Sequence, residues 1–335
     1  MFIIENYQLA IFLCFITMLC WGSWANTQKL ASQKWGFPLF YWDFTLGVII
    51  LSLMFGLTMG STGDSGQAFL PNLQGAASNA IFYALLGGVV FNIANLLLVA
   101  AIDIAGMAIA FPIGIGVALV LGVIVNYVAV PDGDPLLLFG GVGLVTLAIV
   151  VDALAYKRIS KGAATTKGIL ISLAAGILMG FFYRFVAASM SEDFANPTAG
   201  LLTPYTAVFI FSIGIFVSNF IFNSFFMYKP VSGDKVSYAD YFKQGTPKLH
   251  LIGIFGGAIW CLGFLLNMIA AGEAGFAISY GLGQGATMVA AIWGIFIWKE
   301  FKNAPKGTNK LLGLMFFLFI LSLIHISEPT RQEAI

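Results

Sequence analysis

Two stretches of the chain, AGMAIAFPIGIG at residues 105–116 and AGFAISYGLGQG at residues 274–285, resemble each other at an offset of 169 residues. The same offset aligns the pair Gly87 and Gly88 with the pair Gly256 and Gly257. Chance similarity between glycine-rich segments is the alternative, but one offset matches two neighbouring segments without a gap. The pattern therefore predicts an internal repeat in the two halves of the chain.

Composition identifies the solvent around these segments. Of the 335 residues, 59% are hydrophobic and 9% are charged, whereas soluble domains carry about 25% charged residues. So few charges cannot cover a soluble globule of this size, and lipid must surround most of the chain. This excludes a cytosolic enzyme, a nucleic-acid-binding protein and a disordered chain. The net charge of +1 implies no strongly charged partner.

The apolar residues form ten runs, each close to the roughly 20 residues that a helix needs to cross a bilayer. The tenth run is short, and residues 327–335 form a polar tail of doubtful origin. None of the runs alternates as the strands of a membrane β-barrel do. We therefore expect an all-α membrane protein with ten transmembrane helices near residues 8–27, 37–59, 80–102, 106–130, 136–156, 168–190, 203–227, 249–271, 274–298 and 309–326.

The basic residues predict how these spans are oriented. All Lys and Arg residues except Arg184 and Arg331 lie in the connections after the first, fifth, seventh and ninth spans. The positive-inside rule puts these connections in the cytoplasm and both termini outside. We accordingly expect a multi-pass protein of a bacterial-type inner membrane.

The repeat unit contains five spans, so its second copy enters the membrane from the opposite side. The predicted units are residues 1–160 and 161–326. Two inverted five-helix repeats (5+5) are typical of secondary transporters, whose solute site lies near the bilayer midplane where the repeats meet. The polar residues of the spans are therefore candidates for that site.

Two charged residues within the spans each allow two interpretations. Asp43 is a candidate proton-coupling carboxylate, or an interfacial residue paired with Lys29 or Lys34. Arg184 is a candidate solute-binding residue beside Tyr183, or a side chain that extends to the outer surface near acidic residues. In the functional interpretations, proton binding by Asp43 or solute binding by Arg184 explains why a charge is kept within the membrane despite its cost in free energy.

Uncharged side chains complete the predicted site. Amides in membrane helices often bond only to neighbouring helices, but several together favour a neutral polar solute such as a sugar, nucleobase or ureide. Trp21 and Trp260 lie deep enough to line a cavity and stack on such a solute, whereas interfacial tryptophans form a belt. The remaining solute-binding candidates are Tyr183 and the amides Asn92, Asn95, Asn267 and Gln284.

Glycine and proline in the two matched stretches predict close helix packing or a hinge. The spacing of these glycines resembles that of a nucleotide-binding loop, but they lie inside apolar helices, where glycine usually serves close helix packing. Helix breaks at corresponding places in the two repeats would indicate the solute-binding site or a hinge. These hinge and packing candidates are Pro112, Gly114, Gly116, Gly281, Gly283 and Gly285.

Several segments resemble the ureide permease-like branch of the drug/metabolite transporter superfamily, which is related to the glucose/ribose and rhamnose sugar porters. They are YWDFTL at 41–46, the segments 87–96 and 122–127, and WGIF at 293–296 followed by Glu300 and Phe301. The resemblance implies a 5+5 inverted repeat with a central cavity. It also implies proton-coupled uptake of allantoin, uracil or a sugar, with Asp43 at an acidic position of the ureide group. One departure is the short connection between the fifth and sixth spans, which is long and charged in plant ureide permeases.

Other classes of protein fit the sequence less well. Motifs of intramembrane enzymes are missing, and Cys14, Cys20 and Cys261 have neither metal-ligand spacing nor a disulfide pattern. We expect no metal and no cofactor. A passive channel or an exporter remains an alternative to an importer, and a homodimer is compatible with the sequence.

Overall fold

The computed structural model describes residues 1–31, 35–159, 165–231 and 234–328. The elements in chain order are α1 (Tyr7–Ser23), α2 (Ala25–Ala31), α3 (Phe37–Leu57), α4 (Phe69–Gly75), α5 (Ser78–Ala105), α6 (Met107–Ala129), α7 (Pro135–Lys157), α8 (Thr166–Ser189), α9 (Pro204–Tyr228), α10 (Tyr238–Gln244), α11 (Pro247–Ala274), α12 (Phe276–Gly283), α13 (Ala286–Ile292), the π-helix η1 (Trp293–Ile297) and α14 (Thr308–Ser327).

Within the described residues, ten helices are long and apolar enough to cross a membrane. The expected all-α membrane fold with ten spans is therefore confirmed. The first span combines α1 with α2, and the ninth combines α12, α13 and η1. The tenth span is longer than expected from the sequence, because α14 includes 20 residues and ends at Ser327. Residues 329–335 of the predicted polar tail lie outside the described residues.

Local sequence signals explain where several helices begin. Asn6, Asp134 and Thr246 each accept a hydrogen bond from a backbone N–H of the first turn of α1, α7 and α11. The short helix α10 begins with a capping box between Ser237 and Asp240. Hydrogen bonds from Ser237 and from the Gln244 side chain lower the pKa of Asp240.

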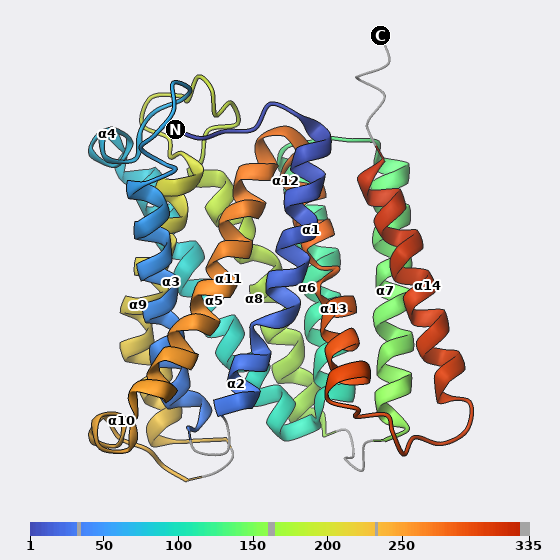
Figure 1. Cartoon of the computed structure of the whole chain (residues 1–335). Helices are drawn as coiled ribbons and strands as arrows, with labels where there is room; N and C mark the ends of the chain where they lie inside the picture. Colours follow the sequence, from blue (N-terminus) through green and yellow to red (C-terminus); the bar gives the residue numbers. More distant parts are fainter. Residues whose placement is uncertain (32–34, 160–164, 232–233, 329–335) are drawn as a thin grey trace.

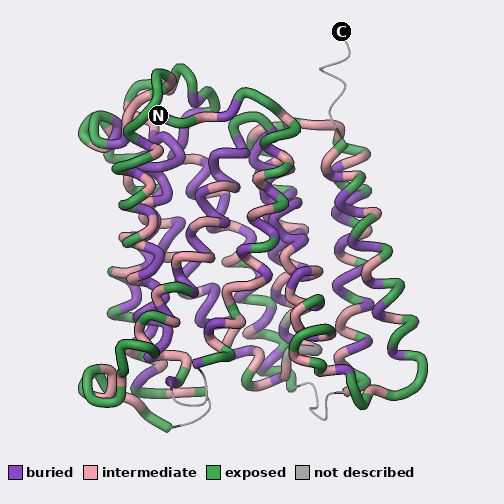
Figure 2. The backbone as a smooth tube through the Cα atoms, in the orientation of Figure 1, coloured by how far each residue is buried: buried purple, intermediate pink, exposed green. Residues whose placement is uncertain are grey.

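The helices form one bundle (Figure 1). α5 packs against α8 and α9, and α11 packs against α1 and α3, while α7 and α14 form a pair at one side. Buried, intermediate and exposed residues alternate along the same helices (Figure 2). The exposed side chains are largely apolar, as a lipid-facing surface requires.

Matched glycines form the interfaces around α5 and α11. A Cβ atom added at Gly88 of α5 would collide with the backbone oxygen of Phe211 in α9. At the position 169 residues later, a Cβ atom on Gly257 of α11 would collide with the backbone oxygen of Phe44 in α3. Both interfaces thus need glycine for close backbone approach. The inverted relation of the two halves stays a prediction, which these corresponding contacts support.

The turns after α5 and α11 also correspond. Gly106 ends α5 with φ 78° and ψ 158°, and Gly275 ends α11 with φ 78° and ψ 153°. Side chains rarely adopt such positive φ values, so glycine is required at both turns. The same sequence match that predicts the repeat therefore has a local structural basis.

The helix breaks differ between the halves, which corrects the expectation of matching breaks. α6 continues through Pro112, whereas the ninth span is interrupted between Gly283 and Ala286. Pro112 lies within the first two turns of α6, where its ring disturbs little preceding helix.

The six hinge and packing candidates have different surroundings. Cβ atoms added at Gly283 and Gly285 would meet Trp21 and Met18 of α1, each at 2.8 Å. At Gly114 the added atom would meet Leu98 at 2.7 Å, whereas Gly116 has open space around it and Gly281 only ordinary contacts. Close packing therefore explains three of the five glycines.

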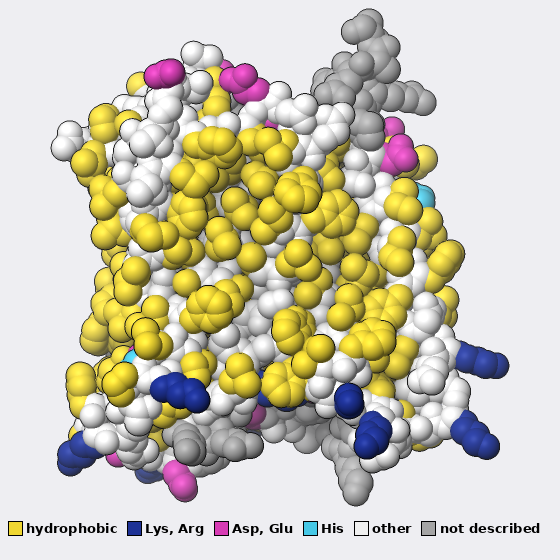
Figure 3. Space-filling model, viewed as in Figure 1, with side chains coloured by type: hydrophobic (Ala, Val, Ile, Leu, Met, Phe, Trp, Pro, Cys, Tyr) yellow, Lys and Arg dark blue, Asp and Glu magenta, His cyan; other side chains and the backbone are white. Residues whose placement is uncertain are grey.

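Lys and Arg side chains gather at one end of the bundle (Figure 3). This end carries α10 and also has some Asp and Glu side chains, whereas the opposite end, which carries the N-terminus, shows Asp and Glu without Lys or Arg in this view. A broad apolar belt lies between them. This is the arrangement expected of a multi-pass membrane protein. The end with Lys and Arg is called the basic end below.

Candidate functional site

A cavity of about 470 Å³ lies within the bundle. Its lining comes from both halves of the sequence, with α1, α2, α5, α6 and α7 from the first and α8, α11, α13 and η1 from the second. The cavity extends from Trp21 and Trp260 to Lys29 and Trp298 at the basic end. The cavity therefore lies between segments from both halves of the sequence, which is where the predicted repeats would meet.

The deeper part of the cavity has an aromatic wall. Trp21 and Trp260 stack with ring centroids 6.1 Å apart and an interplanar angle of 12°. The ring centroid of Phe91 lies 4.4 Å from that of Trp260, and Phe182 also lines the cavity. The Trp21 indole N–H donates to the backbone oxygen of Trp260 at 3.3 Å, which holds the two rings in register. Such a wall suits a planar ring.

Two of the predicted amides also line the cavity. Asn95 of α5 and Gln284, which follows α12, are 5% and 8% exposed. The Asn95 Nδ2 atom is buried and has no hydrogen-bond partner among the described residues. The Tyr41 hydroxyl is its neighbour and interacts with the Asn95 side chain. Because Asn95 also lines the cavity, its amide is a candidate donor to a solute.

Other predicted residues lie outside the cavity lining. Asn92 donates to Ser218 Oγ at 2.8 Å and to the backbone oxygen of Ile215 at 3.3 Å, which joins α5 to α9. Tyr183 donates to Asn267 Oδ1 at 2.7 Å, and Asn267 Nδ2 donates to the backbone of α12. These bonds join helices, which is the alternative interpretation of amides in membrane helices.

Arg184 lies on α8 outside the cavity lining. Its guanidinium is half-buried and within electrostatic reach of Glu192 and Tyr83. This environment corresponds to the second interpretation of Arg184, in which the side chain extends toward acidic residues near the outer end of α8.

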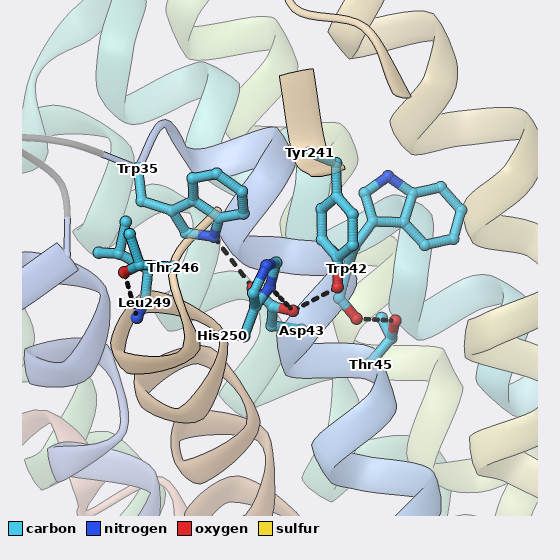
Figure 4. A network of polar contacts seen from close by, with 8 residues as sticks. All are labelled: Trp35, Trp42, Asp43, Thr45, Tyr241, Thr246, Leu249 and His250. Atoms are coloured by element: carbon cyan, nitrogen blue, oxygen red, sulfur yellow. Dashed lines mark hydrogen bonds and ion pairs between the residues drawn. The ribbon is translucent and has the colours of Figure 1, made fainter. Parts of the chain in front are cut away.

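Asp43 is fully buried in a network at the basic end, apart from the cavity (Figure 4). Its carboxylate accepts from Trp35 Nε1 at 3.0 Å and from the Tyr241 hydroxyl at 2.5 Å, and His250 Nδ1 lies 2.8 Å away. Neither alternative partner is observed, because Lys29 pairs with Glu300 and Lys34 lies outside the described residues.

The Asp43 network connects three elements that are distant in sequence. Tyr241 comes from α10 and His250 from the first turn of α11, and both meet Asp43 of α3 (Figure 4). Burial and the hydrogen bond to Asp43 raise the pKa of Tyr241, so its hydroxyl remains a donor. The network therefore fastens the connection between α9 and α11 to the bundle.

A second polar group, at the mouth of the cavity, was not predicted from the sequence. Lys29 of α2 binds Glu300 Oε1 at 2.6 Å and lies 4.3 Å from the Trp298 ring centroid. Tyr156 of α7 donates to Glu300 Oε2 at 2.9 Å. Asp152 lies one turn before Tyr156 and also lines the cavity. The feature of the sequence that could have indicated this group is Asp152, a charged residue within the apolar run 136–156.

The backbone before Glu300 is unusual. The last turns of the ninth span form the π-helix η1, and Lys299 then adopts φ 54°. A positive φ is uncommon for residues other than glycine, and π-turns are often found at functional sites. Together they bring the Glu300 N–H to the backbone oxygen of Gly294 at 3.0 Å and its carboxylate to the cavity mouth.

A ten-span bundle that encloses an aromatic and amide-lined cavity defines a membrane transport protein. Comparison with known proteins gives the family. The model of the ureide permease family matches residues 153–327, which is more than half of the chain. The chain therefore belongs to the ureide permease family, which consists of transporters, not enzymes.

Full-length relatives agree with this assignment. Ureide permease 1 of Arabidopsis thaliana is 23% identical over 384 residues, covering 96% of this chain and 97% of its own. Ureide permease 4 of the same plant is 22% identical with the same coverage. Probable ureide permease A3 of Vigna unguiculata is 21% identical and covers 91% of this chain and 99% of its own.

A solved crystal structure shares the fold. It is 14% identical, has a TM-score of 0.57, and the match covers 95% of this chain and 96% of that chain. At this identity the likeness shows the arrangement of helices alone. The expected membership of the ureide permease branch is thus confirmed, and the relation to the sugar porters stays a prediction.

Proposed function

We propose that this protein is a proton-coupled secondary transporter that takes up small neutral polar solutes of the ureide and nucleobase type, such as allantoin and uracil. The observation that carries the proposal is the cavity in which an aromatic wall meets uncharged amides, in a member of the ureide permease family. An indole face stacks on a flat heterocycle, and amide side chains can both donate to and accept from it.

The membrane orientation belongs to the same proposal. The basic end faces the cytoplasm, both termini lie outside, and the cavity reaching Lys29 represents the cytoplasm-facing state. A bacterial-type inner membrane fits this arrangement. Rocking of the two halves about the cavity would then expose the solute to the other side.

Uptake by proteoliposomes tests the proposed function. We expect radiolabelled allantoin to accumulate under an inward proton gradient and excess uracil to block it. A sugar porter is the alternative, because aromatic faces also stack on sugars, and it predicts accumulation of labelled hexoses instead of allantoin. Uptake that never exceeds the external concentration would identify a passive channel, and gradient-driven efflux would identify an exporter.

Replacing Gln284 by Ala should weaken solute binding without unfolding the protein. Gln284 lines the cavity, and one hydrogen bond contributes about 0.5–1.5 kcal/mol, which corresponds to a roughly two- to tenfold higher KM. Asn92→Ala is the matched control, because Asn92 bonds to α9 outside the cavity lining and should affect thermal stability instead. Equal KM values for Gln284→Ala and the parent protein would contradict the cavity assignment.

Replacing Asp43 by Asn tests its proposed role in proton coupling. Asn keeps one oxygen, which can accept from either Trp35 or Tyr241 but not from both, because these two residues donate to different oxygens of Asp43. Its amide group cannot bind a proton at neutral pH. We expect gradient-driven accumulation to fall at least tenfold, while exchange of labelled for unlabelled allantoin without a gradient continues. The control is Asp64→Asn, the same chemical change in an exposed connection. Unchanged accumulation with unchanged pH dependence would refute the role of Asp43.

A further inference from the structure

One oxygen of the Asp152 carboxylate, Oδ1, is a buried acceptor without a hydrogen-bond partner among the described residues. Asp152 also lines the cavity. It lies five residues before the end of α7, or about 7 Å from that end at 1.5 Å per residue. A buried carboxylate without a partner costs free energy, so it needs a compensating group.

The neighbouring donors are already engaged by Glu300. The Tyr156 hydroxyl has a single proton, which it donates to Glu300 Oε2 at 2.9 Å. Lys29 lies 2.6 Å from Glu300 Oε1 and against the Trp298 ring. Glu300 therefore holds these two donors at the mouth and leaves the acceptor of Asp152 available to the cavity.

The backbone keeps this arrangement in place. η1 and the positive φ of Lys299 direct Glu300 back toward α7. A Cβ atom added at Gly294 would lie 2.8 Å from the Tyr156 hydroxyl oxygen and 2.9 Å from Glu300 Oε2. The absence of a side chain at Gly294 thus leaves room for the hydrogen bond between Tyr156 and Glu300.

The charges that line this part of the cavity are mainly negative. Asp152 comes from α7, Glu300 follows η1, Asp103 comes from α5, and Lys29 of α2 is the basic residue of the described lining. The lining residues of α1, α6, α8, α11 and α13 carry no charge. Donor groups, and positive charge in particular, are therefore favoured beside Asp152.

We propose that Asp152 is a solute-binding carboxylate that accepts two adjacent N–H groups of a planar ureido, amide or guanidino group. A carboxylate has two oxygens that can accept parallel N–H donors, as it does from an arginine side chain. The Asn95 amide in the cavity lining suits the carbonyl oxygen of such a solute, and the wall of Trp21 and Trp260 suits its plane. This inference rests on the proposed function and specifies what the cavity recognises.

The proposal predicts that solutes bind according to the arrangement of their hydrogen-bond donors. A ureide presents paired N–H groups in one plane, whereas a hexose presents hydroxyl groups that point in several directions. A guanidinium ion presents the same paired N–H groups with a positive charge, which strengthens the bond to a carboxylate. We therefore expect methylguanidine to bind this cavity in competition with allantoin.

Equilibrium binding to the purified full-length protein in detergent tests the proposal, with labelled allantoin and labelled methylguanidine as probes. In Asp152→Asn, one acceptor oxygen becomes an amide donor and the charge is lost. We expect at least tenfold weaker binding of allantoin and at least a hundredfold weaker binding of methylguanidine. Asp152→Glu retains the charge and should bind methylguanidine within tenfold of the parent protein. Asp64→Asn, in an exposed connection, should bind both probes normally.

The outcomes distinguish this inference from the proposed function. Methylguanidine affinity that is unchanged in Asp152→Asn, or no binding of methylguanidine by the parent protein, overturns the role of Asp152. Equal losses in Asp152→Asn and Asp152→Glu would indicate a structural role and also overturn it. If methylguanidine binds through Asp152 but allantoin does not bind at all, the inference stands and the ureide substrate is wrong. Asp152→Asn should fold, because Oδ1 of Asp152 bonds to no described residue.

Discussion

Replacing Trp21 by Ala should weaken solute binding strongly while leaving a folded protein. Trp21 lines the cavity and stacks on Trp260 at 6.1 Å, so its ring forms part of the surface that a planar solute would contact. Stacking of a base on an aromatic side chain contributes about 1–3 kcal/mol, which corresponds to a roughly 5- to 150-fold loss of affinity. The KM of allantoin exchange in proteoliposomes measures this effect.

Two further variants make the result specific. Trp21→Phe retains an aromatic face and should recover part of the affinity. Trp42→Ala removes an equally large side chain that donates to Met227 and lies outside the cavity lining, so it should lower stability but leave the KM nearly unchanged. If Trp21→Ala and Trp42→Ala change the KM equally, the aromatic wall does not bind the solute.

Replacing Gly257 by Ala should destabilise the whole bundle. The added methyl group would collide with the backbone oxygen of Phe44 and lie 2.8 Å from the adjoining carbonyl carbon, and neither atom can move without shifting α3. Overpacking of this kind costs about 1–3 kcal/mol. Cys14, Cys20 and Cys261 are buried and free, so the rate at which they react with a thiol-specific dye on heating reports unfolding.

The matched control for Gly257→Ala is the same substitution at Gly313 of α14. A Cβ atom added there has no neighbour within 4 Å, and alanine favours a helix over glycine by about 1 kcal/mol. The two variants should therefore shift the midpoint of thermal unfolding in opposite directions. Similar shifts would show that the contact between α3 and α11 does not require glycine at this position.

The candidate site was only partly predictable from the sequence. The depth of Trp21 and Trp260 within their spans led to the expectation that both line a cavity. Both do line the cavity, together with Asn95 and Gln284. Depth alone could not distinguish these residues from Asn92, whose amide faces α9 instead. The reason is that helices apolar on nearly all sides have little hydrophobic asymmetry to reveal which side faces a cavity.

Charged residues were harder to assign. Asp43 was recognised as unusual within its span, but its contact with His250 joins residues that are 207 positions apart. No role for Asp152 was predicted from the sequence, although it is a carboxylate within an apolar run. Its significance depends on Tyr156 and Lys29 being bound to Glu300, which is known only once α2, α7 and η1 are placed together.

The sequence by itself determined that the chain is an all-α membrane protein with ten spans and basic residues grouped in alternate connections. These properties follow from local hydrophobicity and from the distribution of charge, which the bilayer selects directly. The tertiary structure decided which polar groups bond to the protein and which stay available to a solute. That outcome depends on close helix contacts such as the one at Gly257, because packing against neighbouring helices sets how each helix is rotated.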